Sequence, residues 1–393
     1  MSQMTTAGLY IHIPFCRHRC GYCAFAISTL GHGDHQVQSN YLSALKSELK
    51  MRVQRHGPIV FDTLYVGGGT PSRLQPDLIE DLGNWLQETE LIKSKESTFE
   101  VNPEDLLEQP NLSQTIQDAG FNRVSLGIQT LSPNGLKVLE RRADPKGISD
   151  ALQLLTLSSK QLSFDFILGW PGQTIEDVEN DLAFIKTHRP GHISAYILNL
   201  EPGTRLTKKV EMDISLKPDD DQTGQHWDHF RQSLINSGYL NYEISSFSLP
   251  GLQSQHNRST WKGNPYLGLG SGAVSRIGQT RWTNHKTPKK YLEAIANRRW
   301  PVVYAEYTGK DVAWQEALLL GCRHDEGLSL SELASYFRTP LPDILFNSIR
   351  LGVECGDLIK TPDRLCFTPR GWARFDAWIS DWMLILEKLE LNN

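Results

Sequence analysis

Short apolar runs alternate with amphipathic stretches along the first half of the chain, and this alternation restricts the fold more than any other feature. Apolar runs of this length, bounded by polar or turn residues, are typical of buried strands. The stretches between them place apolar residues on one helical face, as at Leu42, Leu45 and Leu49. Six strand-then-helix units in series predict parallel βα units. The runs are GLYIHIPF at 8–15, DTLYVGG at 62–68, STFEVN at 97–102, RVSLGIQ at 123–129, SFDFILG at 163–169 and HISAYILNL at 192–200.

Polar residues that could bind a ligand or take part in catalysis follow many of these runs. Their positions favour one of two α/β architectures. A doubly wound sheet concentrates its site at one switch point, whereas a β/α barrel gathers residues from many strand ends at its mouth. We therefore predict an α/β fold with a partial (β/α)6 barrel of the TIM type. The residues concerned are Cys16, the turn Gly67-Gly68-Gly69-Thr70-Pro71, Glu100 and Asn102, Gln129, Asp165, and Glu201-Pro202-Gly203.

The alternation stops after about residue 205, and the remaining chain is of a different kind. We assign residues 1–245 to the barrel, 246–309 to a glycine-rich connecting segment, and 310–393 to a smaller α+β domain. LSLSELASYF and DILFNSIRLGVECG predict two helices, and DLIKTPDRLCFT predicts a hairpin, as in a winged-helix domain. Residues 313–393 carry 8 basic and 12 acidic residues, so we expect no nucleic-acid partner.

Composition and the lack of a recognisable secretion signal predict a reducing compartment for this protein. The net charge is −5, and no run approaches the roughly 20 apolar residues of a membrane-spanning helix. The first residues lack a cationic start followed by an apolar core, so we expect a cytoplasmic protein without a signal peptide. Clustered thiols in such a compartment indicate metal binding more than disulfides.

Three of the six cysteines lie within eight residues, as Cys16-x3-Cys20-x2-Cys23. Three buried structural thiols are a poor explanation, because Arg17, His18 and Arg19 lie between them. A structural zinc site needs four ligands, so His12 or His18 would have to be the fourth. A [4Fe–4S] cluster normally takes four cysteines, and with three it leaves one iron open to a small molecule.

The spacing C-x3-C-x2-C after a first strand, followed by GGGTP after the second, resembles the radical S-adenosylmethionine (SAM) superfamily. LYIHIPFC, LYVGGGTPS, FEVNP, RVSLGIQT, FDFILGWPGQT and HN-x3-W-x-G resemble its coproporphyrinogen-oxidase-like branch over nearly the whole chain. The resemblance implies a [4Fe–4S] cluster on Cys16, Cys20 and Cys23. It further implies that SAM chelates the open iron and is cleaved on reduction to a 5′-deoxyadenosyl radical.

The resemblance also implies a SAM site at matching positions of this chain. A carboxylate for ribose hydroxyls and an arginine for a carboxylate are suitable partners. On their own, Gly67–Gly69 are equally explained by a tight turn, and Arg141 by a solvated helix position. Asp165 lies between two phenylalanines, so we expect it to be buried with a partner. The implied residues are Tyr10 and Tyr22 beside the cluster, Gly68, Gly69 and Thr70 at the methionine moiety, and Glu100, Gln129, Arg141 and Asp165 as further SAM contacts.

Two features separate the oxidases of this branch from its heme chaperones. The oxidases resemble C-x3-C-x2-C-x-C, and Phe25 stands where their additional cysteine would be. The chaperones carry H-N-x-x-Y-W, which this chain matches at His256, Asn257 and Trp261 but not at Thr260. A histidine can ligate heme iron, and Trp261 and Tyr266 offer faces for a porphyrin, whereas a histidine hydrogen-bonded in a loop is the alternative for His256.

The chain is accordingly identified as a member of the heme chaperone family of radical SAM type. The resemblance implies that it binds heme and passes it to acceptor hemoproteins. Peripheral membrane association and a homodimer are further expectations. The alternatives are an oxygen-independent coproporphyrinogen III oxidase, a radical SAM enzyme with another substrate such as a methyltransferase, and a zinc-binding module without enzymatic activity.

Overall fold

The computed structural model describes residues 5–29 and 33–391. Within them, a central sheet of 12 strands runs in the order β12-β11-β10-β9-β1-β2-β3-β4-β5-β6-β8-β7. β1 to β6 are parallel neighbours, and each contains one of the six predicted runs or most of it. Because the order is linear, the sheet has two free ends, as a partial barrel requires. The six strands are β1 (Thr5–Ile13), β2 (Ile59–Gly68), β3 (Ile92–Val101), β4 (Arg123–Gln129), β5 (Leu162–Leu168) and β6 (His192–Ile197).

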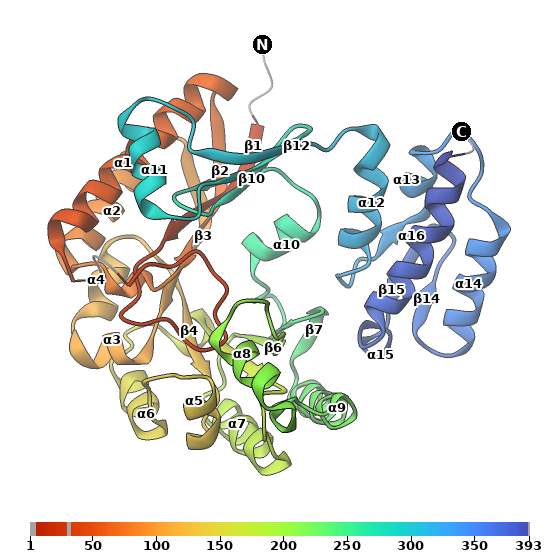
Figure 1. Cartoon of the computed structure of the whole chain (residues 1–393), viewed down its shortest axis with the longest axis horizontal. Helices are drawn as coiled ribbons and strands as arrows, with labels where there is room; N and C mark the ends of the chain where they lie inside the picture. The colour runs from red at the N-terminus through yellow and green to blue at the C-terminus, as the bar shows by residue number, and fades with distance from the viewer. Residues whose placement is uncertain (1–4, 30–32, 392–393) are drawn as a thin grey trace.

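Most of the helices that precede residue 300 cover the outer face of this sheet (Figure 1). The capping residues agree with the helix starts: Asp34 accepts from the Val37 amide at the first helix, and Thr174 and Asp177 form a capping box at the seventh. The helices are α1 (His35–His56), α2 (Pro76–Glu88), α3 (Pro103–Glu108), α4 (Leu112–Asp118), α5 (Pro133–Val138), α6 (Pro145–Gln153), α7 (Ile175–His188), α8 (Arg205–Met212), α9 (Asp220–Asn236), α10 (Gln255–Trp261) and α11 (Pro288–Ala296).

The two faces of the parallel strands have opposite character. Leu9 and Ile11 of β1 belong to the same buried apolar cluster as Leu42 and Leu45 of α1. Alternate residues point to the other face, because side chains alternate along a strand. On that inner face the strands carry polar side chains, among them Tyr65 of β2. The predicted fold class is therefore confirmed, and its inner face is the place for a polar site.

The segment 246–309 does more than connect two domains. It contributes strands to both ends of the sheet, and β9 pairs in parallel with β1. Glycine is required at Gly268, because an added Cβ would lie 2.2 Å from the carbonyl oxygen of Val274. The division at residues 245 and 309 stays a prediction. The strands outside the parallel core are β7 (Leu240–Glu243), β8 (Ser246–Ser248), β9 (Tyr266–Leu269), β10 (Val274–Ile277), β11 (Thr280–Asn284) and β12 (Val302–Tyr307).

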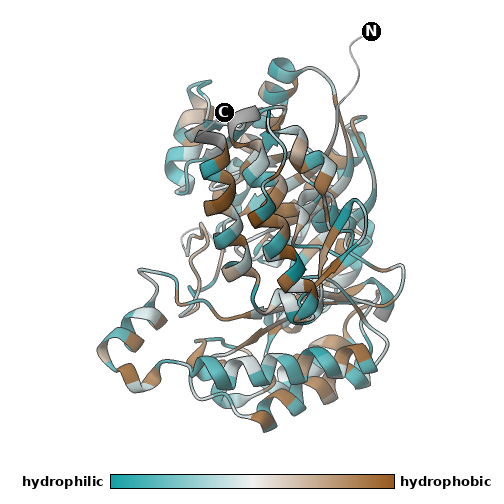
Figure 2. Cartoon of the chain, turned by 90° about the vertical axis from the view of Figure 1, so that its right-hand side faces the viewer, coloured by the Kyte–Doolittle hydropathy of each residue, from teal (hydrophilic) through white to brown (hydrophobic). Residues whose placement is uncertain are grey.

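The C-terminal residues form a separate lobe with its own apolar core (Figure 1). Both predicted helices and the predicted hairpin are present, and the hairpin strands pair antiparallel. The helices alternate hydrophobic and hydrophilic stretches, as amphipathic helices do (Figure 2). No helix of the described residues is long and apolar enough to cross a membrane. The elements are α12 (Lys310–Gly321), β13 (Leu328–Ser329), α13 (Leu330–Ser335), α14 (Asp343–Glu354), β14 (Leu358–Lys360), β15 (Arg364–Phe367), α15 (Pro369–Trp372) and α16 (Phe375–Leu391).

Candidate functional site

The loop that follows β1 carries the three clustered cysteines over the mouth of the barrel. Backbone hydrogen bonds fix it at several points: the Cys16 amide donates to the Ser28 carbonyl at 2.9 Å, and the Gly21 amide donates to the Leu139 carbonyl at 3.1 Å. All three cysteines line one cavity of about 550 Å³. That volume is typical of a site for a cofactor or small molecule.

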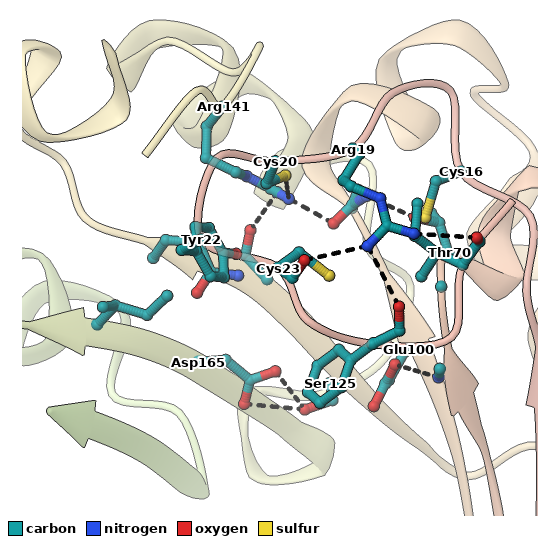
Figure 3. Close-up of a pocket in the computed structure, with 18 of the residues that line it drawn as sticks. Cys16, Arg19, Cys20, Tyr22, Cys23, Thr70, Glu100, Ser125, Arg141 and Asp165 are labelled. Carbon is teal, nitrogen blue, oxygen red and sulfur yellow. Dashed lines mark hydrogen bonds between the residues drawn. The ribbon is translucent and has the colours of Figure 1, made fainter. Parts of the chain in front are cut away.

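The three thiols face this cavity from one loop but have different surroundings (Figure 3). Burial raises the pKa of Cys16 to about 12, and its Sγ lies 3.4 Å from the Thr70 hydroxyl. Burial also raises the pKa of Cys23. Burial opposes ionisation of Cys20 as well, but hydrogen bonding to His18 and the charge of Arg141 outweigh it, and the Cys20 pKa is lowered.

Three thiolate donors opening on a shared cavity fit a [4Fe–4S] cluster, since thiolates are the usual protein ligands of iron–sulfur clusters. The cluster would take Cys16, Cys20 and Cys23 as ligands, and these three residues would leave one of its irons without a protein ligand. Among the described residues, no three histidine, cysteine, aspartate or glutamate side chains surround one ion-sized position. This finding includes Cys16, Cys20 and Cys23, so it does not distinguish zinc from an iron–sulfur cluster.

The GGGTP turn at the end of β2 is shaped by contacts within the protein. Gly68 has φ +115°, and an added Cβ would lie 2.4 Å from His12 Nδ1. An added Cβ at Gly69 would lie 2.7 Å from the carbonyl carbon of Pro14. Gly68, Gly69 and Thr70 all line the cavity, as the sequence predicted for SAM contacts. The missing side chains of the two glycines let the turn pack against β1 and the cysteine loop, so ligand approach is not needed to explain them.

Glu100, at the end of β3, is a buried carboxylate on the cavity wall. It accepts hydrogen bonds from the Tyr65 hydroxyl at 2.8 Å and from the Gly68 amide at 3.0 Å. Burial raises the Glu100 pKa to about 7, although these two donors oppose the shift. Glu100 thus changes charge near neutral pH, and its remaining lone pairs are available to hydroxyl donors of a ligand.

Arg141 is not a solvated helix residue: it lies in the turn between α5 and α6, and only 6% of its side chain is exposed. Its Nη2 donates to Asn102 Oδ1 at 3.0 Å and to the Gly127 carbonyl at 2.9 Å, and its Nη1 lies 3.8 Å from Cys20 Sγ. The predicted cofactor residue Arg141 is therefore brought next to the predicted cluster ligand Cys20.

Asp165 and Gln129 reach the same cavity from β5 and β4. Asp165 accepts from the Ser125 hydroxyl at 2.9 Å, and burial raises its pKa to about 6 (Figure 3). This agrees with the expectation of a partner for Asp165. Gln129 has φ +71°, a left-handed conformation that is uncommon for residues other than glycine. Backbone strain of this kind clusters at functional sites.

Two of the predicted cofactor residues lie elsewhere than on the cavity wall. Tyr22 lines the cavity, but Tyr10 does not, and the Tyr10 hydroxyl is 3.0 Å from His12 Nδ1 inside the barrel. His256 is buried in the barrel interior, with Nδ1 3.0 Å from the Thr63 hydroxyl. Its neighbour Asn257 lines the cavity instead. The roles of Tyr10 in cofactor binding and of His256 in heme binding stay predictions.

Trp261, the last named residue of the HN-x3-W motif, contacts the C-terminal lobe. The guanidinium of Arg323 lies 4.5 Å from the ring centre of Trp261, so the C-terminal lobe covers one face of this ring. Arg258 of the same helix pairs with Glu326 at 2.7 Å. The helix α10 therefore joins the barrel to the C-terminal lobe.

Several residues that build the site were missed at the sequence level. Arg19 donates to the backbone carbonyls of Cys23 at 3.1 Å and Ile27 at 3.2 Å, which folds the cysteine loop back on itself (Figure 3). Glu140, with φ +55°, accepts from Lys209 at 2.7 Å, and its backbone oxygen is 2.9 Å from His18 Nε2. Ser125 could have been predicted from the sequence, because it lies two residues before Gly127 on the inward face of β4.

The chain is similar to known proteins of one superfamily. A model of the radical SAM superfamily matches residues 10–185. The heme chaperone HemW of Mycobacterium tuberculosis is 33% identical over 372 residues, which cover 94% of this chain and 93% of that protein. HemW of Escherichia coli K12 is 32% identical, over 70% of this chain and 72% of that protein.

The chain belongs to the HemW family of heme chaperones.

HemW of Bacillus subtilis is a further relative, 29% identical over 86% of this chain and 89% of that protein. The solved structure of the radical SAM enzyme coproporphyrinogen III oxidase (HemN) from Escherichia coli matches with a TM-score of 0.79. The match covers 96% of this chain and 90% of that chain at 20% identity. This likeness supports the fold, whereas the HemW relatives decide the family.

Proposed function

We propose that this protein is a heme chaperone that binds heme and transfers it to acceptor hemoproteins. The observation that carries the proposal is the match to HemW relatives over nearly the whole chain, including both the barrel and the C-terminal lobe. Phe25 is the second support, because it stands where the resemblance to the oxidases requires a cysteine. Phe25 lines the cavity and is 68% exposed.

The cavity residues are suited to a [4Fe–4S] cluster and SAM, as the radical SAM family implies. Cys16, Cys20 and Cys23 would hold the cluster. When bound, the cluster supplies reducing electrons and an open iron for SAM. Arg141 holds a positive charge beside Cys20, and Glu100 presents a buried acceptor for hydroxyl groups. Gln129, Asp165 and the turn at Gly68 to Thr70 complete the proposed SAM site, with Tyr22 against the loop.

The decisive experiment compares heme transfer with porphyrinogen oxidation in the same anaerobic preparation. Hemin-loaded protein is mixed with a heme-free acceptor hemoprotein, and formation of the acceptor's absorption band is followed. In parallel, SAM, a reductant and coproporphyrinogen III are added, and protoporphyrinogen is measured. We expect the acceptor hemoprotein to take up heme faster from the loaded protein than from free hemin. We expect no formation of protoporphyrinogen beyond one turnover. Many turnovers of coproporphyrinogen III would overturn the chaperone proposal in favour of the oxidase.

Cytoplasmic location, association with a membrane surface and a homodimer belong to the same proposal. Fractionation of the producing cells tests the cytoplasmic location and the membrane association. Sedimentation of the cluster-loaded protein tests the homodimer. Heme ligation by His256 is a separate part of the proposal, because it requires the buried imidazole to become accessible.

A further inference from the structure

A second cavity adjoins the first along the cysteine loop. Its volume is about 500 Å³, and it is more open to solvent than the first. Among the described residues that line it, three are arginines and none is an aspartate or a glutamate. A concave site with several cations and no lining carboxylate attracts anions. The lining residues are Arg17, His18, Arg19, Ile27, Thr29 and Arg205.

The three arginines differ in how far their charge is neutralised. Arg17 pairs with Glu108, and Arg205 pairs with Glu140. Arg19 makes its hydrogen bonds to backbone carbonyls and, in the described part of the chain, forms no ion pair with a carboxylate. Its positive charge therefore remains available to a ligand.

Arg17 and Arg205 also keep donor groups for a ligand. Their side chains are 34% and 50% exposed. A guanidinium carries five N–H donors in a fixed fork. Within residues 5–29 and 33–391, Arg17 uses only Nη2, and Arg205 leaves Nη1 without a partner. Both can receive a second carboxylate while the existing ion pairs stay in place.

An apolar surface lies next to these cations. Ile27 lines both cavities, and Phe25, which lines the first, is 68% exposed. An exposed aromatic ring beside a cluster of arginines is suited to a flat apolar ligand that carries anionic groups at its edge. Heme has this chemistry, because its porphyrin face is apolar and its two propionates are carboxylates.

We propose that the cleft formed by Arg17, Arg19 and Arg205 binds the two carboxylates of the heme cargo. The inference rests on the proposed function, and it assigns the recognition of cargo to the cysteine loop, where Arg17 and Arg19 line both cavities. Arginine forks pair with carboxylates through two parallel hydrogen bonds, which gives geometric selectivity as well as affinity. Heme held there lies along the loop that holds the cysteines, with Phe25 beside it.

The test compares hemin with hemin dimethyl ester, in which both carboxylates are blocked and the porphyrin face is unchanged. Each is titrated into the cluster-loaded protein, and the Soret band is followed. We expect hemin to bind at least about tenfold more tightly than the ester, which corresponds to about 1.4 kcal/mol. In Arg17→Gln/Arg205→Gln the ratio should fall toward one. Arg142→Gln is the matched control, because Arg142 is exposed and lines only the first cavity.

Iron and sulfide contents of each variant establish that the loop still holds its cluster. If a variant loses the cluster, the comparison of hemin with hemin dimethyl ester in the wild-type protein still tests the inference, because it needs no substitution. Equal affinities of wild-type protein for hemin and its ester would overturn the inference and leave the chaperone proposal standing. Absence of hemin binding altogether would overturn the chaperone proposal as well. Pyrophosphate is titrated alone: tight binding combined with equal affinities for hemin and ester would make the cleft a phosphate site.

Discussion

The imidazole of His256 and the hydroxyl of Thr63 form a hydrogen-bonded pair inside the barrel, with Nδ1 and Oγ1 3.0 Å apart. His256 also packs against Tyr65, with ring centres 5.5 Å apart. Burial lowers the His256 pKa to about 4, so the ring is neutral at pH 7. The first residue of the HN-x3-W motif is therefore part of the barrel interior in this structure.

Replacing His256 by alanine should destabilise the protein in the absence of heme. The substitution removes a buried ring and leaves the Thr63 hydroxyl without its partner, which costs about 1–3 kcal/mol for the polar group alone. Denaturant unfolding of heme-free protein measures the effect. The control is His229→Ala, an exposed histidine on α9, which should stay within about 0.5 kcal/mol. Unchanged stability of His256→Ala would contradict the buried role and strengthen a role at the surface.

Replacing Cys20 by alanine should abolish assembly of the iron–sulfur cluster. Cys20 is one of only three thiols on the cavity, so its loss leaves two protein ligands, fewer than a stable cluster needs. Iron and sulfide analysis after anaerobic reconstitution, together with the broad brown absorbance, measures the outcome. Cys355→Ala is the control, because Cys355 lies at the end of α14 in the C-terminal lobe. Equal iron and sulfide in Cys20→Ala and wild type would refute the ligand assignment.

The six strands of the parallel core and several residues of the cavity wall were predictable from the sequence, because both depend on local patterns. An apolar run followed by a polar residue places that residue at the mouth of a parallel barrel, as it did for Glu100 and Asp165. Cysteine spacing of three and two residues places the thiols on one loop in the same way. Alternation along a strand also accounts for the inward direction of Ser125.

Contacts between distant segments were not predictable in this way. Nothing local in the sequence reveals that Glu140 meets Arg205 and Lys209 of a helix more than sixty residues later. The glycines of the GGGTP turn illustrate the same limit. An added Cβ at Gly68 would meet the ring of His12 on the neighbouring strand, a contact that the motif itself does not reveal. His256 was expected either to ligate heme or to form a hydrogen bond in a loop, whereas it lies in α10 and contacts Thr63 of β2, which is a long-range feature.

The ionisation of Glu100 predicts how stability depends on pH. Its pKa is about 7 in the folded protein against an ordinary value of 4.5, because burial disfavours the charge. Between these two values the folded state binds more protons than the unfolded state, so this group lowers the free energy of unfolding as pH rises from about 4.5 to 7. In Glu100→Gln the free energy of unfolding should therefore decline less between pH 4.5 and 7, and the variant should be more stable than wild type at pH 8.

Denaturant unfolding of SAM-free protein at pH 5 and pH 8 tests this expectation. Glu306→Gln is a control, since a hydrogen bond from Arg281 lowers the pKa of that carboxylate, whose side chain is 32% exposed. The same loss of stability with rising pH in Glu100→Gln and wild type would show that another group is responsible.

The ion pairs of Glu140 should determine how long the cysteine loop retains its iron. Glu140 accepts from Lys209 at 2.7 Å and from Arg205 Nε at 2.8 Å, and both cations belong to α8. The backbone of α8 also bonds the loop, since the Leu206 amide donates to the Gly21 carbonyl at 2.9 Å. Burial opposes the charge of Glu140, but the two cations outweigh it and lower its pKa. Glu140→Gln should release α8 from the loop and speed iron loss.

Exposed ion pairs contribute about 0.2–1 kcal/mol each, so we expect the rate of iron transfer to a chelator to rise about two- to tenfold in Glu140→Gln. Salt should accelerate iron loss from wild type, because it screens these pairs, and should have less effect on the variant. Lys146→Ala is the matched control, because it removes another exposed ion pair, with Asp150, that does not touch the loop. Iron loss from Glu140→Gln at the wild-type rate, with the same salt dependence, would show that α8 does not secure the loop.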